Sequence, residues 1–272
     1  MLLKNRVALI TGGAKGMGKA MSLRFAREGC DIIVSDLDIN GAGDVAAQVQ
    51  ALGRQSLALK ADISQSADVS AMVSKVIKQF GKIDILVNNA GSAGGGNIDT
   101  STEADWDRVI DVNLKGHFLV TRAIVPYMKK NKYGKIVFLS SMGAVHPSVS
   151  VLAYHAAKAG IIGLTLNLAF ELAPHNIYVN CIVPGPIDTP FWNPLSEGMS
   201  GKEKQAFFKA LAEKEVPLGR MGKAEDIAGP ALFLVSGLSD YVTGQILYVA
   251  GGQPGLAPAA TFMSAPKKRR QR

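Results

Sequence analysis

Several features that would identify other classes of protein are scarce in this sequence. Only two cysteines occur among 272 residues, Cys30 and Cys181, and both lie beside apolar, strand-like runs. We therefore expect buried free thiols rather than a disulfide, as in a reducing cytoplasm. No apolar run approaches the roughly 18 residues needed to span a bilayer. The four histidines show no metal-ligand spacing with cysteine, aspartate or glutamate, which predicts catalysis without a metal.

Without the last six residues, the chain has only a small excess of positive charge. The net charge is +8, and residues 267–272 supply five of these positive charges, which leaves +3 for residues 1–266. A short basic end is typical of a solvated, disordered tail, although an acidic partner, an anionic substrate or a targeting signal is an alternative. The first strand-like run starts at residue 6 and leaves no room for a signal peptide. We expect a cytoplasmic protein without nucleic-acid or membrane partners.

Short apolar runs alternate with longer amphipathic stretches, and 47% of the residues are hydrophobic. The runs are rich in Val, Ile and Leu without clear polar alternation, as in parallel strands that helices cover on both faces. They span residues 7–11, 31–35, 56–60, 83–88, 135–140, 178–183 and 245–249. The helical stretches span residues 17–28, 42–52, 67–80, 103–130, 151–173 and 224–236. This alternation predicts right-handed crossovers and a doubly wound α/β sheet in one domain.

Two regions interrupt this alternation. Residues 186–216 insert a loop and a predicted helix pair, and residues 253–272 extend beyond the last strand. Irregular segments beyond strand ends are where such sheets place specificity. We therefore assign residues 1–252 to a dinucleotide-binding and catalytic domain, residues 186–216 to a substrate lid, and residues 253–272 to an extension with a basic, disordered end.

A glycine-rich turn directly follows the first strand and opens the first helix. Gly12 permits the tight turn, Gly16 lets the backbone approach a phosphate, and Gly18 allows close helix–strand packing. The helix N-terminus then offers free N–H groups and a positive dipole end to a pyrophosphate. Lys15 and Met17 lie in the same turn. The position between a strand and a helix predicts a dinucleotide site.

An acidic residue at the end of the second strand bears on the choice of dinucleotide. Asp36 follows Gly18 by eighteen residues, and a carboxylate there can accept hydrogen bonds from the ribose 2′- and 3′-hydroxyls. It would repel a 2′-phosphate and so favours NAD over NADP. Lys15 favours the opposite choice, because a basic residue in the turn could meet that phosphate. The carboxylate would face the phosphate directly, whereas Lys15 can swing to solvent, so we expect NAD.

Three polar residues in the middle of the chain predict proton transfer. Tyr154 and Lys158 are four residues apart, so they share one face of a helix. A nearby ammonium favours the phenolate and lowers the pKa of a tyrosine, which can then act as general acid in reduction and general base in oxidation. Ser141 ends the fifth strand, and its hydroxyl can donate to a carbonyl oxygen as charge develops there. Beside a dinucleotide, the trio predicts hydride transfer.

From about residue 4 to residue 252 the chain resembles the short-chain dehydrogenases/reductases. The motifs that carry the resemblance are residues 11–18, Asp62-Ile63, Asn88-Asn89-Ala90-Gly91, Asn113, Ser140-Ser141, Tyr154-x-x-x-Lys158 and residues 184–189. The resemblance implies a Rossmann-type, seven-stranded parallel sheet with helices on both faces. It also implies a homo-oligomer, a tetramer or a dimer, whose interface uses residues of about 103–130 and 151–173.

The resemblance also implies roles for single residues. Tyr154 would move the proton, Lys158 would lower its pKa and hold the nicotinamide ribose, Ser141 would bind the substrate oxygen, and Asn113 would anchor a water in a proton relay. Asn88 is as well explained as a tie between strands. We expect cofactor contacts from Gly12, Lys15, Gly16, Met17, Gly18, Asp36, Asp62, Ile63, Asn89, Ala90, Gly91, Tyr154, Lys158, Pro184, Gly185, Ile187 and Thr189.

The substrate pocket is harder to predict. We expect it to include Ser141, Gly143, His146, Tyr154, Pro186, Phe191 and Trp192. Phe207, Phe208 and Leu211 are expected to pack the lid helix onto the body of the protein. His155 is expected to be structural, and His117 and His175 to lie at the surface or at a helix end.

These features favour an NAD-dependent oxidoreductase of a secondary alcohol or ketone, acting on a moderately large, partly apolar small molecule. A cyclic or aromatic alcohol, a hydroxysteroid and a hydroxyacyl-CoA all fit. An alternative enzyme function is an NADPH-dependent 3-oxoacyl-carrier-protein reductase. Lys15 and the net positive charge favour this alternative, and Asp36 disfavours it. A non-catalytic dinucleotide-binding subunit is a third reading, although such proteins typically lose Tyr, Lys or Ser, and all three remain here.

Overall fold

The computed structural model describes residues 1–146 and 151–253, apart from the side chains of Pro194 and Leu195. The predicted C-terminal extension beyond residue 253 and part of the segment after Ser141 therefore lie outside the described residues. The strands are β1 (Val7–Thr11), β2 (Asp31–Asp36), β3 (Ser56–Lys60), β4 (Ile85–Asn88), β5 (Gly134–Leu139), β6 (Ile177–Pro184) and β7 (Ile246–Val249). The α-helices are α1 (Gly16–Arg27), α2 (Ile39–Ala51), α3 (Ser66–Phe80), α4 (Glu103–Ile110), α5 (Gly116–Asn131), α6 (Leu152–Leu172), α7 (Gly201–Glu215) and α8 (Ala224–Val235).

All seven strands form one parallel sheet in the order β3-β2-β1-β4-β5-β6-β7. The winding reverses between β1 and β4, which are neighbours with Ala8 opposite Ile85. In open α/β sheets, ligands bind outside the carboxyl ends of the strands at this reversal. The predicted Rossmann-type, doubly wound sheet is confirmed, and it places the site beside the turn that follows β1.

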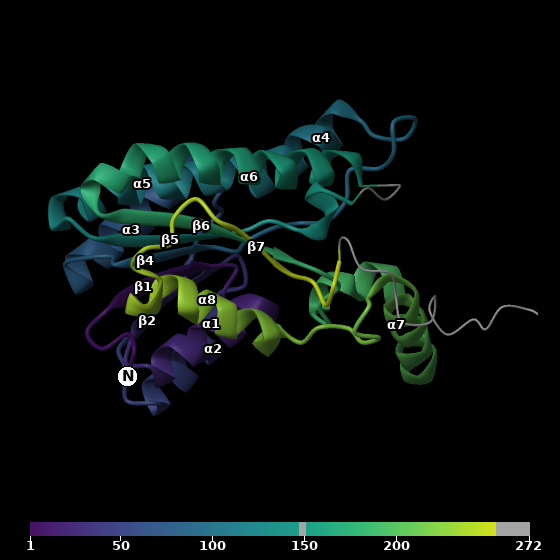
Figure 1. Ribbon diagram of the computed structural model, residues 1–272, viewed down its shortest axis with the longest axis horizontal. Coiled ribbons are helices and arrows are strands. Elements are labelled where there is room, and N and C mark those ends of the chain that lie inside the picture. The colour runs from purple at the N-terminus through teal and green to yellow at the C-terminus, as the bar shows by residue number, and fades with distance from the viewer. Residues whose placement is uncertain (147–150, 254–272) are drawn as a thin grey trace, which may run out of the picture.

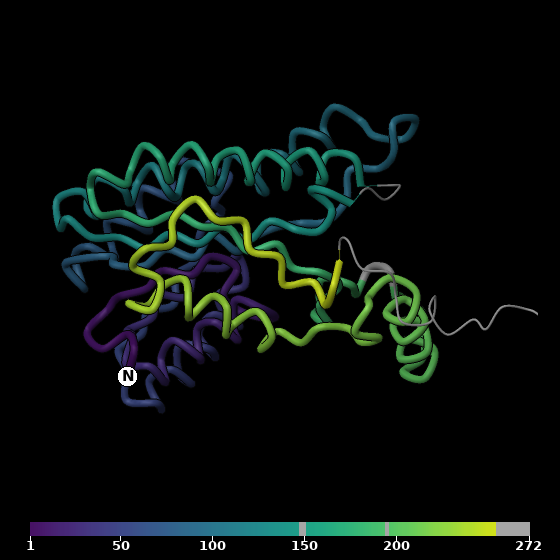
Figure 2. The backbone as a smooth tube through the Cα atoms, viewed as in Figure 1, coloured from purple at the N-terminus to yellow at the C-terminus, as the bar shows by residue number. Residues whose placement is uncertain are grey.

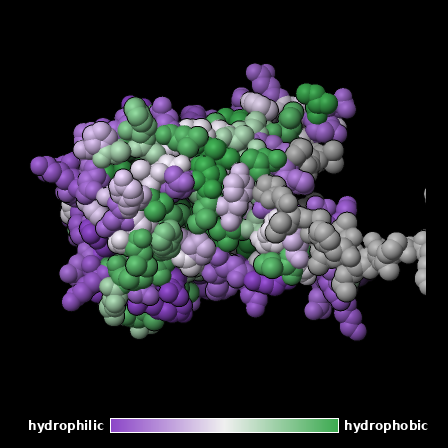
Figure 3. All heavy atoms as spheres, in the orientation of Figure 1, coloured by the Kyte–Doolittle hydropathy of each residue, from purple (hydrophilic) through white to green (hydrophobic). Residues whose placement is uncertain are grey.

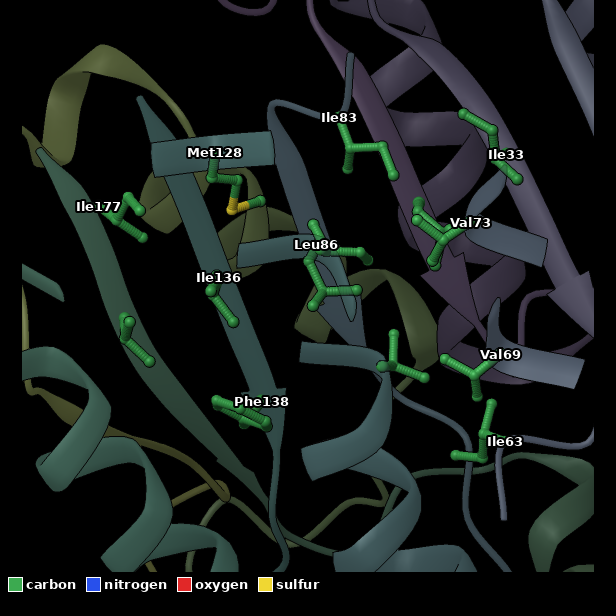
Figure 4. Packing of buried hydrophobic residues seen from close by; sticks show 14 of the residues in the cluster. Ile33, Ile63, Val69, Val73, Ile83, Leu86, Met128, Ile136, Phe138 and Ile177 are labelled. Carbon is green, nitrogen blue, oxygen red and sulfur yellow. The ribbon is translucent and has the colours of Figure 1, made fainter. Parts of the chain in front are cut away.

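Helices cover both faces of the sheet. Figure 1 shows α3, α5 and α6 on one face and α1, α2 and α8 on the other, with the sheet between them. Successive residues of β1 alternate between the two layers, since Val7 and Leu9 belong to one core cluster and Ala8 and Ile10 to the other. Figure 4 shows the first cluster, in which Leu86, Ile136 and Phe138 pack from neighbouring strands.

The long helix predicted over residues 103–130 is interrupted. A five-residue π-helix, Asp111–Lys115, separates α4 from α5. Wider turns of this kind are frequent at functional sites. Asn113 lies within the π-helix and is buried, so the interruption occurs at a predicted catalytic residue.

The region predicted as a lid contains one short 3₁₀ segment, Pro190–Ser196, and the helix α7. Both the ribbon and the tube show α7 beyond the carboxyl ends of the strands, apart from the layers that cover the sheet (Figures 1 and 2). The capping box of Ser200 and Glu203 begins α7, and Phe208 and Ala212 form its buried side. Phe208 therefore packs α7 onto the protein as expected, whereas Phe207 is 38% exposed.

One stretch of the described residues, Leu152–His175, is long and apolar enough to cross a membrane by length and composition alone. The prediction from the sequence concerned uninterrupted apolar runs, and Lys158 and Glu171 interrupt this stretch. Most of this stretch is α6, whose inner side buries Ala157, Ile161 and Thr165 within the protein. In this fold it is a helix of the domain and carries Tyr154 and Lys158.

Large apolar side chains also remain exposed elsewhere. In Figure 3 apolar residues gather in the middle of one face, over the β7 edge and α8. Phe233, Leu238, Tyr241 and Tyr248 are among the exposed hydrophobic residues of this part of the chain. Both cysteines are buried and unpaired, as expected.

Candidate active site

The turn between β1 and α1 is shaped by three glycines. Gly12 and Gly16 have positive φ values of 64° and 54°, which residues with a side chain rarely adopt. A Cβ on Gly12 would lie 2.8 Å from the Cα of Ala90, and a Cβ on Gly18 would collide with the carbonyl oxygen of Gly12. The roles predicted for the turn and for helix–strand packing therefore match the geometry. The side chain of Met17 packs partly buried against the core.

Two polar side chains hold this turn in place. The Thr11 hydroxyl donates to the carbonyl of Val87 and accepts from the backbone N–H groups of Asn89 and Ala90. The Asn89 amide donates to the carbonyl oxygens of Thr11 and Gly12, each at 2.9 Å. The side chain of Asn89 is thus occupied by the turn itself. Thr11, whose role the sequence analysis did not predict, links the ends of β1 and β4.

Asp36 lies beside the glycine turn, at the carboxyl end of β2. One carboxylate oxygen accepts from the N–H of Ala14 and the other from the N–H of Asp38, each at 3.0 Å. These bonds fix the carboxylate where β2 meets the turn. Lys15, which could meet a 2′-phosphate and so favours NADP, is exposed to solvent.

Asp62 and Ile63 follow β3 and differ in where their side chains point. An Asp62 oxygen accepts from the N–H and the hydroxyl of Ser64. Ile63 is 4% exposed, and its side chain packs against Gly116 in the core. An adenine contact from Ile63 would therefore have to come from its backbone.

Tyr154 and Lys158 lie on the first two turns of α6. The hydroxyl of Ser140 donates to the Lys158 carbonyl at 2.8 Å, which ties this part of the helix to the end of β5. The side chains of Ser141 and Tyr154 share a hydrogen bond. The Ser141 oxygen also accepts from the N–H of Gly143 at 3.1 Å. The predicted catalytic serine and tyrosine are therefore adjacent at the edge of the sheet where the glycine turn lies.

The expected effect of Lys158 on the tyrosine is not present in this geometry. The Lys158 ammonium donates to the carbonyl of Leu139 at 2.9 Å and lies 5.7 Å from the centre of the Tyr154 ring. Burial raises the pKa of Tyr154, and the hydrogen bond with Ser141 opposes this effect. Burial lowers the pKa of Lys158 to about 8. The ammonium is directed to Leu139 in this structure, and the effect of Lys158 on the tyrosine pKa stays a prediction.

Asn113 ties the π-helix to the segment after β4. Its amide donates to the carbonyl oxygens of Val109 and Ser92, each at 2.9 Å, and its oxygen accepts from the N–H of Ser92 at 3.3 Å. A Cβ on Gly91 would lie 2.8 Å from this oxygen and 3.5 Å from the Lys158 nitrogen. Gly91 thus keeps space open between Asn113 and Lys158. The proton relay through Asn113 stays a prediction.

His117, one helical turn after Asn113, is fully buried rather than at the surface as expected. Its Nε2 lies 2.7 Å from the carbonyl oxygen of Ala90. A carbonyl can only accept, so Nε2 carries the proton. Burial, with the charge of Lys158 as a smaller cause, lowers the pKa of His117 to about 3. The imidazole is therefore neutral and supports the segment that contains Ala90 and Gly91.

The segment after β6 is held from two sides. Pro184 ends β6 opposite Val249, and the N–H of Gly185 donates to the Val249 carbonyl. The Pro186 carbonyl accepts from Gly222, whose own carbonyl accepts from Asp188. On the other side, a Cβ on Gly16 would touch the Thr189 methyl group at 3.3 Å. The segment therefore borders the glycine turn closely, as expected for Ile187 and Thr189.

A row of aromatic rings continues from this segment to α7. The Phe191 ring centre lies 5.8 Å from that of Tyr154, and Trp192 meets both Phe191 and Phe208 edge-on, at 6.1 and 6.0 Å. The indole N–H of Trp192 donates to the Ile187 carbonyl at 2.8 Å. Of the two predicted pocket aromatics, Phe191 lies beside the catalytic phenol, whereas Trp192 joins the segment to α7.

The remaining predicted pocket residues, Gly143, His146 and Pro186, lie in different surroundings. Gly143 packs against His155, since a Cβ there would lie 2.7 Å from the imidazole. His146 is exposed, with Nε2 4.0 Å from a carboxylate oxygen of Glu215 at the end of α7. Pro186 lines a cavity of about 210 Å³ with Arg220 and the end of β7. Among the described residues, no group of three His, Cys, Asp or Glu side chains is placed to hold a metal ion.

The parallel sheet, the glycine turn at its winding reversal and the adjacent Ser–Tyr pair with a nearby lysine define a Rossmann-type oxidoreductase. Comparisons with known proteins agree. A family model described as enoyl-(acyl carrier protein) reductase matches residues 12–253. The chain belongs to the short-chain dehydrogenase/reductase family, enzymes that use a nicotinamide dinucleotide, NAD or NADP.

Individual relatives differ in what they act on. The (2S)-[(R)-hydroxy(phenyl)methyl]succinyl-CoA dehydrogenase subunit BbsD of Thauera aromatica is 44% identical over 253 residues, covering 93% of this chain and 98% of that protein. The 3-oxoacyl-(acyl-carrier-protein) reductase FabG of Thermotoga maritima is 40% identical over 252 residues, with coverage of 93% and 99%. The crystal structure of an NAD⁺-bound xylitol dehydrogenase matches with a TM-score of 0.86 at 32% identity, covering 93% of this chain and 100% of that one.

Proposed function

We propose that this protein is an NAD-dependent dehydrogenase that interconverts a secondary alcohol and a ketone, on a moderately large and partly apolar small molecule. The observation that carries the proposal is the placement of Ser141, Tyr154 and Lys158 together beside the glycine turn. A nicotinamide bound there would supply or accept the hydride. Two relatives whose names denote dehydrogenases of hydroxyl compounds support the alcohol–ketone class.

The proton is handled by the protein's own side chains. In alcohol oxidation, Tyr154 must first lose its proton, and the phenolate oxygen then accepts the proton of the substrate hydroxyl while the carbon loses a hydride and a carbonyl forms. In reduction, the phenol returns a proton to the carbonyl oxygen. Ser141 donates a hydrogen bond to the same oxygen and so stabilises the charge that develops on it. Lys158, directed to Leu139 in this structure, would have to turn toward the phenol to assist it.

The choice of NAD rests on Asp36. Its carboxylate is held beside the glycine turn by Ala14 and Asp38. A carboxylate in this place accepts hydrogen bonds from ribose hydroxyls and repels a 2′-phosphate. A Cβ on Gly12 or Gly91 would collide with neighbouring protein atoms and one on Gly16 would touch Thr189, so the backbone of this region fits only glycine at these positions.

A 3-oxoacyl-carrier-protein reductase using NADPH is the second candidate. The exposed Lys15 and the FabG relative favour it. The two candidates differ in cofactor and direction, so absorbance at the nicotinamide wavelength separates them. We expect NAD⁺ reduction with secondary alcohols from a panel of cyclic, aromatic, steroid and acyl-CoA compounds. Turnover only with NADPH and an oxoacyl thioester would establish the second candidate. NADH binding without turnover of any compound would favour a non-catalytic subunit.

We further propose a homo-oligomer, a dimer or tetramer, in the cytoplasm. Phe118 on α5 and Leu166 and Phe170 on α6 are large apolar residues that are 43%, 50% and 88% exposed. Such side chains, on helices next to one another in the fold, are typical of a subunit contact. Light scattering after gel filtration should give a multiple of the chain mass, and Phe170→Asp should lower it. A monomeric wild-type protein would refute this proposal.

A further inference from the structure

Phe191 lies where its side chain can affect which substrates bind beside the Tyr154 phenol. This inference rests on the function proposed above. Its ring centre is 5.8 Å from that of Tyr154, and the two ring planes are inclined by 43°. Although Phe191 is large and apolar, it is 41% exposed. An exposed aromatic side chain therefore lies beside the ring whose hydroxyl exchanges a proton with the substrate.

The position of Phe191 is constrained by its neighbours in the chain. Trp192 donates its indole N–H to the Ile187 carbonyl, and its backbone N–H bonds to the Thr189 carbonyl at 3.2 Å. The Trp192 ring also packs edge-on against Phe208, which is 8% exposed. With Trp192 anchored on both sides, the backbone that carries Phe191 is held next to Tyr154.

The reaction itself limits where substituents can lie. The substrate oxygen must be within hydrogen-bond reach of the Tyr154 and Ser141 hydroxyls, so the reacting carbon lies about one bond beyond that oxygen. Because Phe191 lies beside the Tyr154 ring, a ring attached directly to this carbon can approach Phe191 to the 4.5–7 Å over which aromatic rings pack against one another. A planar ring on that carbon can stack on Phe191, and a second, flexible substituent can extend away from it.

We propose that Phe191 is a specificity-determining residue and that the preferred substrate carries an aromatic ring on the carbon that is oxidised. The substrate class is then an aryl secondary alcohol and the corresponding aryl ketone. Ring–ring contacts are favourable beyond the apolar area that they bury, so a saturated ring of similar size binds less well in the same place. A preference for aryl over cyclohexyl substrates follows directly.

The test compares 1-phenylethanol with 1-cyclohexylethanol, which differ only in the aromaticity of the ring. The kcat/KM of both substrates is measured with NAD⁺ for the wild type, Phe191→Leu and Phe191→Tyr. Phe207→Leu is the matched control, because Phe207 contacts Phe208 at the far end of the aromatic row, with ring centres 5.3 Å apart. The affinity for NADH and the melting temperature are measured for each variant.

We expect the wild type to prefer the phenyl compound and Phe191→Leu to lower its kcat/KM by about 3- to 10-fold, with little change for the cyclohexyl compound. Phe191→Tyr keeps the ring and should keep the preference, as should Phe207→Leu. Affinity for NADH should be the same in all four proteins. An equal loss on both substrates would instead make Phe191 a packing residue and overturn the proposal.

Two further results separate this proposal from the function on which it rests. Turnover of cyclohexyl or steroid alcohols at least as efficient as that of aryl alcohols would overturn the aryl preference and leave the dehydrogenase function intact. Failure of every alcohol and ketone in the panel, despite NADH binding, would overturn the dehydrogenase function and the aryl preference together.

Discussion

The glycine turn and residues 187–208 border each other at one edge of the sheet, yet different forces hold them. The turn depends on positive φ at Gly12 and Gly16 and on the Asn89 side-chain amide, which donates to two of its carbonyl oxygens. Residues 187–208 are held largely by side chains, through the Trp192 indole and edge-on ring contacts. Added side-chain atoms should disrupt the glycine turn, because the backbone leaves no space for them. Substitutions among the rings of residues 187–208 should have smaller and graded effects.

The largest effect is expected at Tyr154, where the two regions meet. Tyr154→Phe removes the proton donor and keeps the ring that contacts Phe191. We expect kcat to fall by about 10²- to 10⁴-fold. Tyr178→Phe is the control, because among the described residues the Tyr178 hydroxyl bonds to the Asn176 side chain alone, near the start of β6. Steady-state kinetics check both variants, and a Tyr154→Phe enzyme of normal kcat would exclude the proposed proton transfer.

Gly18→Ala tests how strictly the backbone defines the turn. The added Cβ would collide with the Gly12 carbonyl and lie 2.8 Å from the Asn89 amide nitrogen. We expect a loss of about 1–3 kcal/mol in unfolding free energy, together with much weaker NADH binding. Gly43→Ala in α2, which has nothing within 4 Å, should instead stabilise the protein by up to about 1 kcal/mol. Equal behaviour of the two alanine variants in thermal melts and NADH titrations would show that the turn is not tightly constrained.

Trp192→Phe tests the ring-built region. The variant loses the hydrogen bond to the Ile187 carbonyl but keeps an aromatic ring between Phe191 and Phe208. Ile187 is one of the predicted cofactor contacts, so losing the hydrogen bond to its carbonyl should weaken NADH binding. Because one hydrogen bond contributes modestly, the affinity should fall by about 2- to 10-fold. ADP-ribose, which lacks the nicotinamide, should bind as to the wild type. Trp106→Phe on α4 is the control, and an equal loss for NADH and ADP-ribose would place the effect on the whole fold.

The smallest effect is expected at His117, which supports the segment that contains Ala90 and Gly91. Its pKa is lowered from 6.5 to about 3 in the folded protein, so as the pH falls below 6.5 the unfolded chain gains a proton that the folded protein does not. The contribution to stability is present above pH 6.5 and is lost as the pH falls toward 3. The difference in melting temperature between the wild type and His117→Asn should therefore narrow between pH 7 and pH 5. His175→Asn, at an exposed position, should give a constant difference, and a constant difference for His117→Asn would contradict the assignment of a buried neutral imidazole.

The sheet and the glycine turn could be predicted because local sequence determines them, whereas the placement of Ser141 beside Tyr154 was implied by the resemblance to a known family. Runs of Val and Ile favour buried strands, glycines mark the turn, and a four-residue spacing places Tyr154 and Lys158 on one helix face. These features depend little on what surrounds each residue.

Other features depended on tertiary contacts and could not be predicted. The π-helix at Asn113 forms where Ser92 and Val109 bind the Asn113 amide. His117 is buried because Ala90 offers a carbonyl acceptor inside the fold. The direction of the Lys158 ammonium depends on the Leu139 carbonyl. Spacing indicates which residues share a face of a helix, but it does not indicate the atom that each side chain contacts.

The central claim, an NAD-dependent enzyme, is tested most directly by fluorescence titration of the wild type and Asp36→Asn with NADH and NADPH. We expect the wild type to bind NADH at least about tenfold more tightly, because the Asp36 carboxylate repels a 2′-phosphate. In Asp36→Asn, which keeps the shape of the side chain and removes its charge, this preference should largely disappear. Tighter binding of NADPH by the wild type would contradict the claim and make the carrier-protein reductase the leading function.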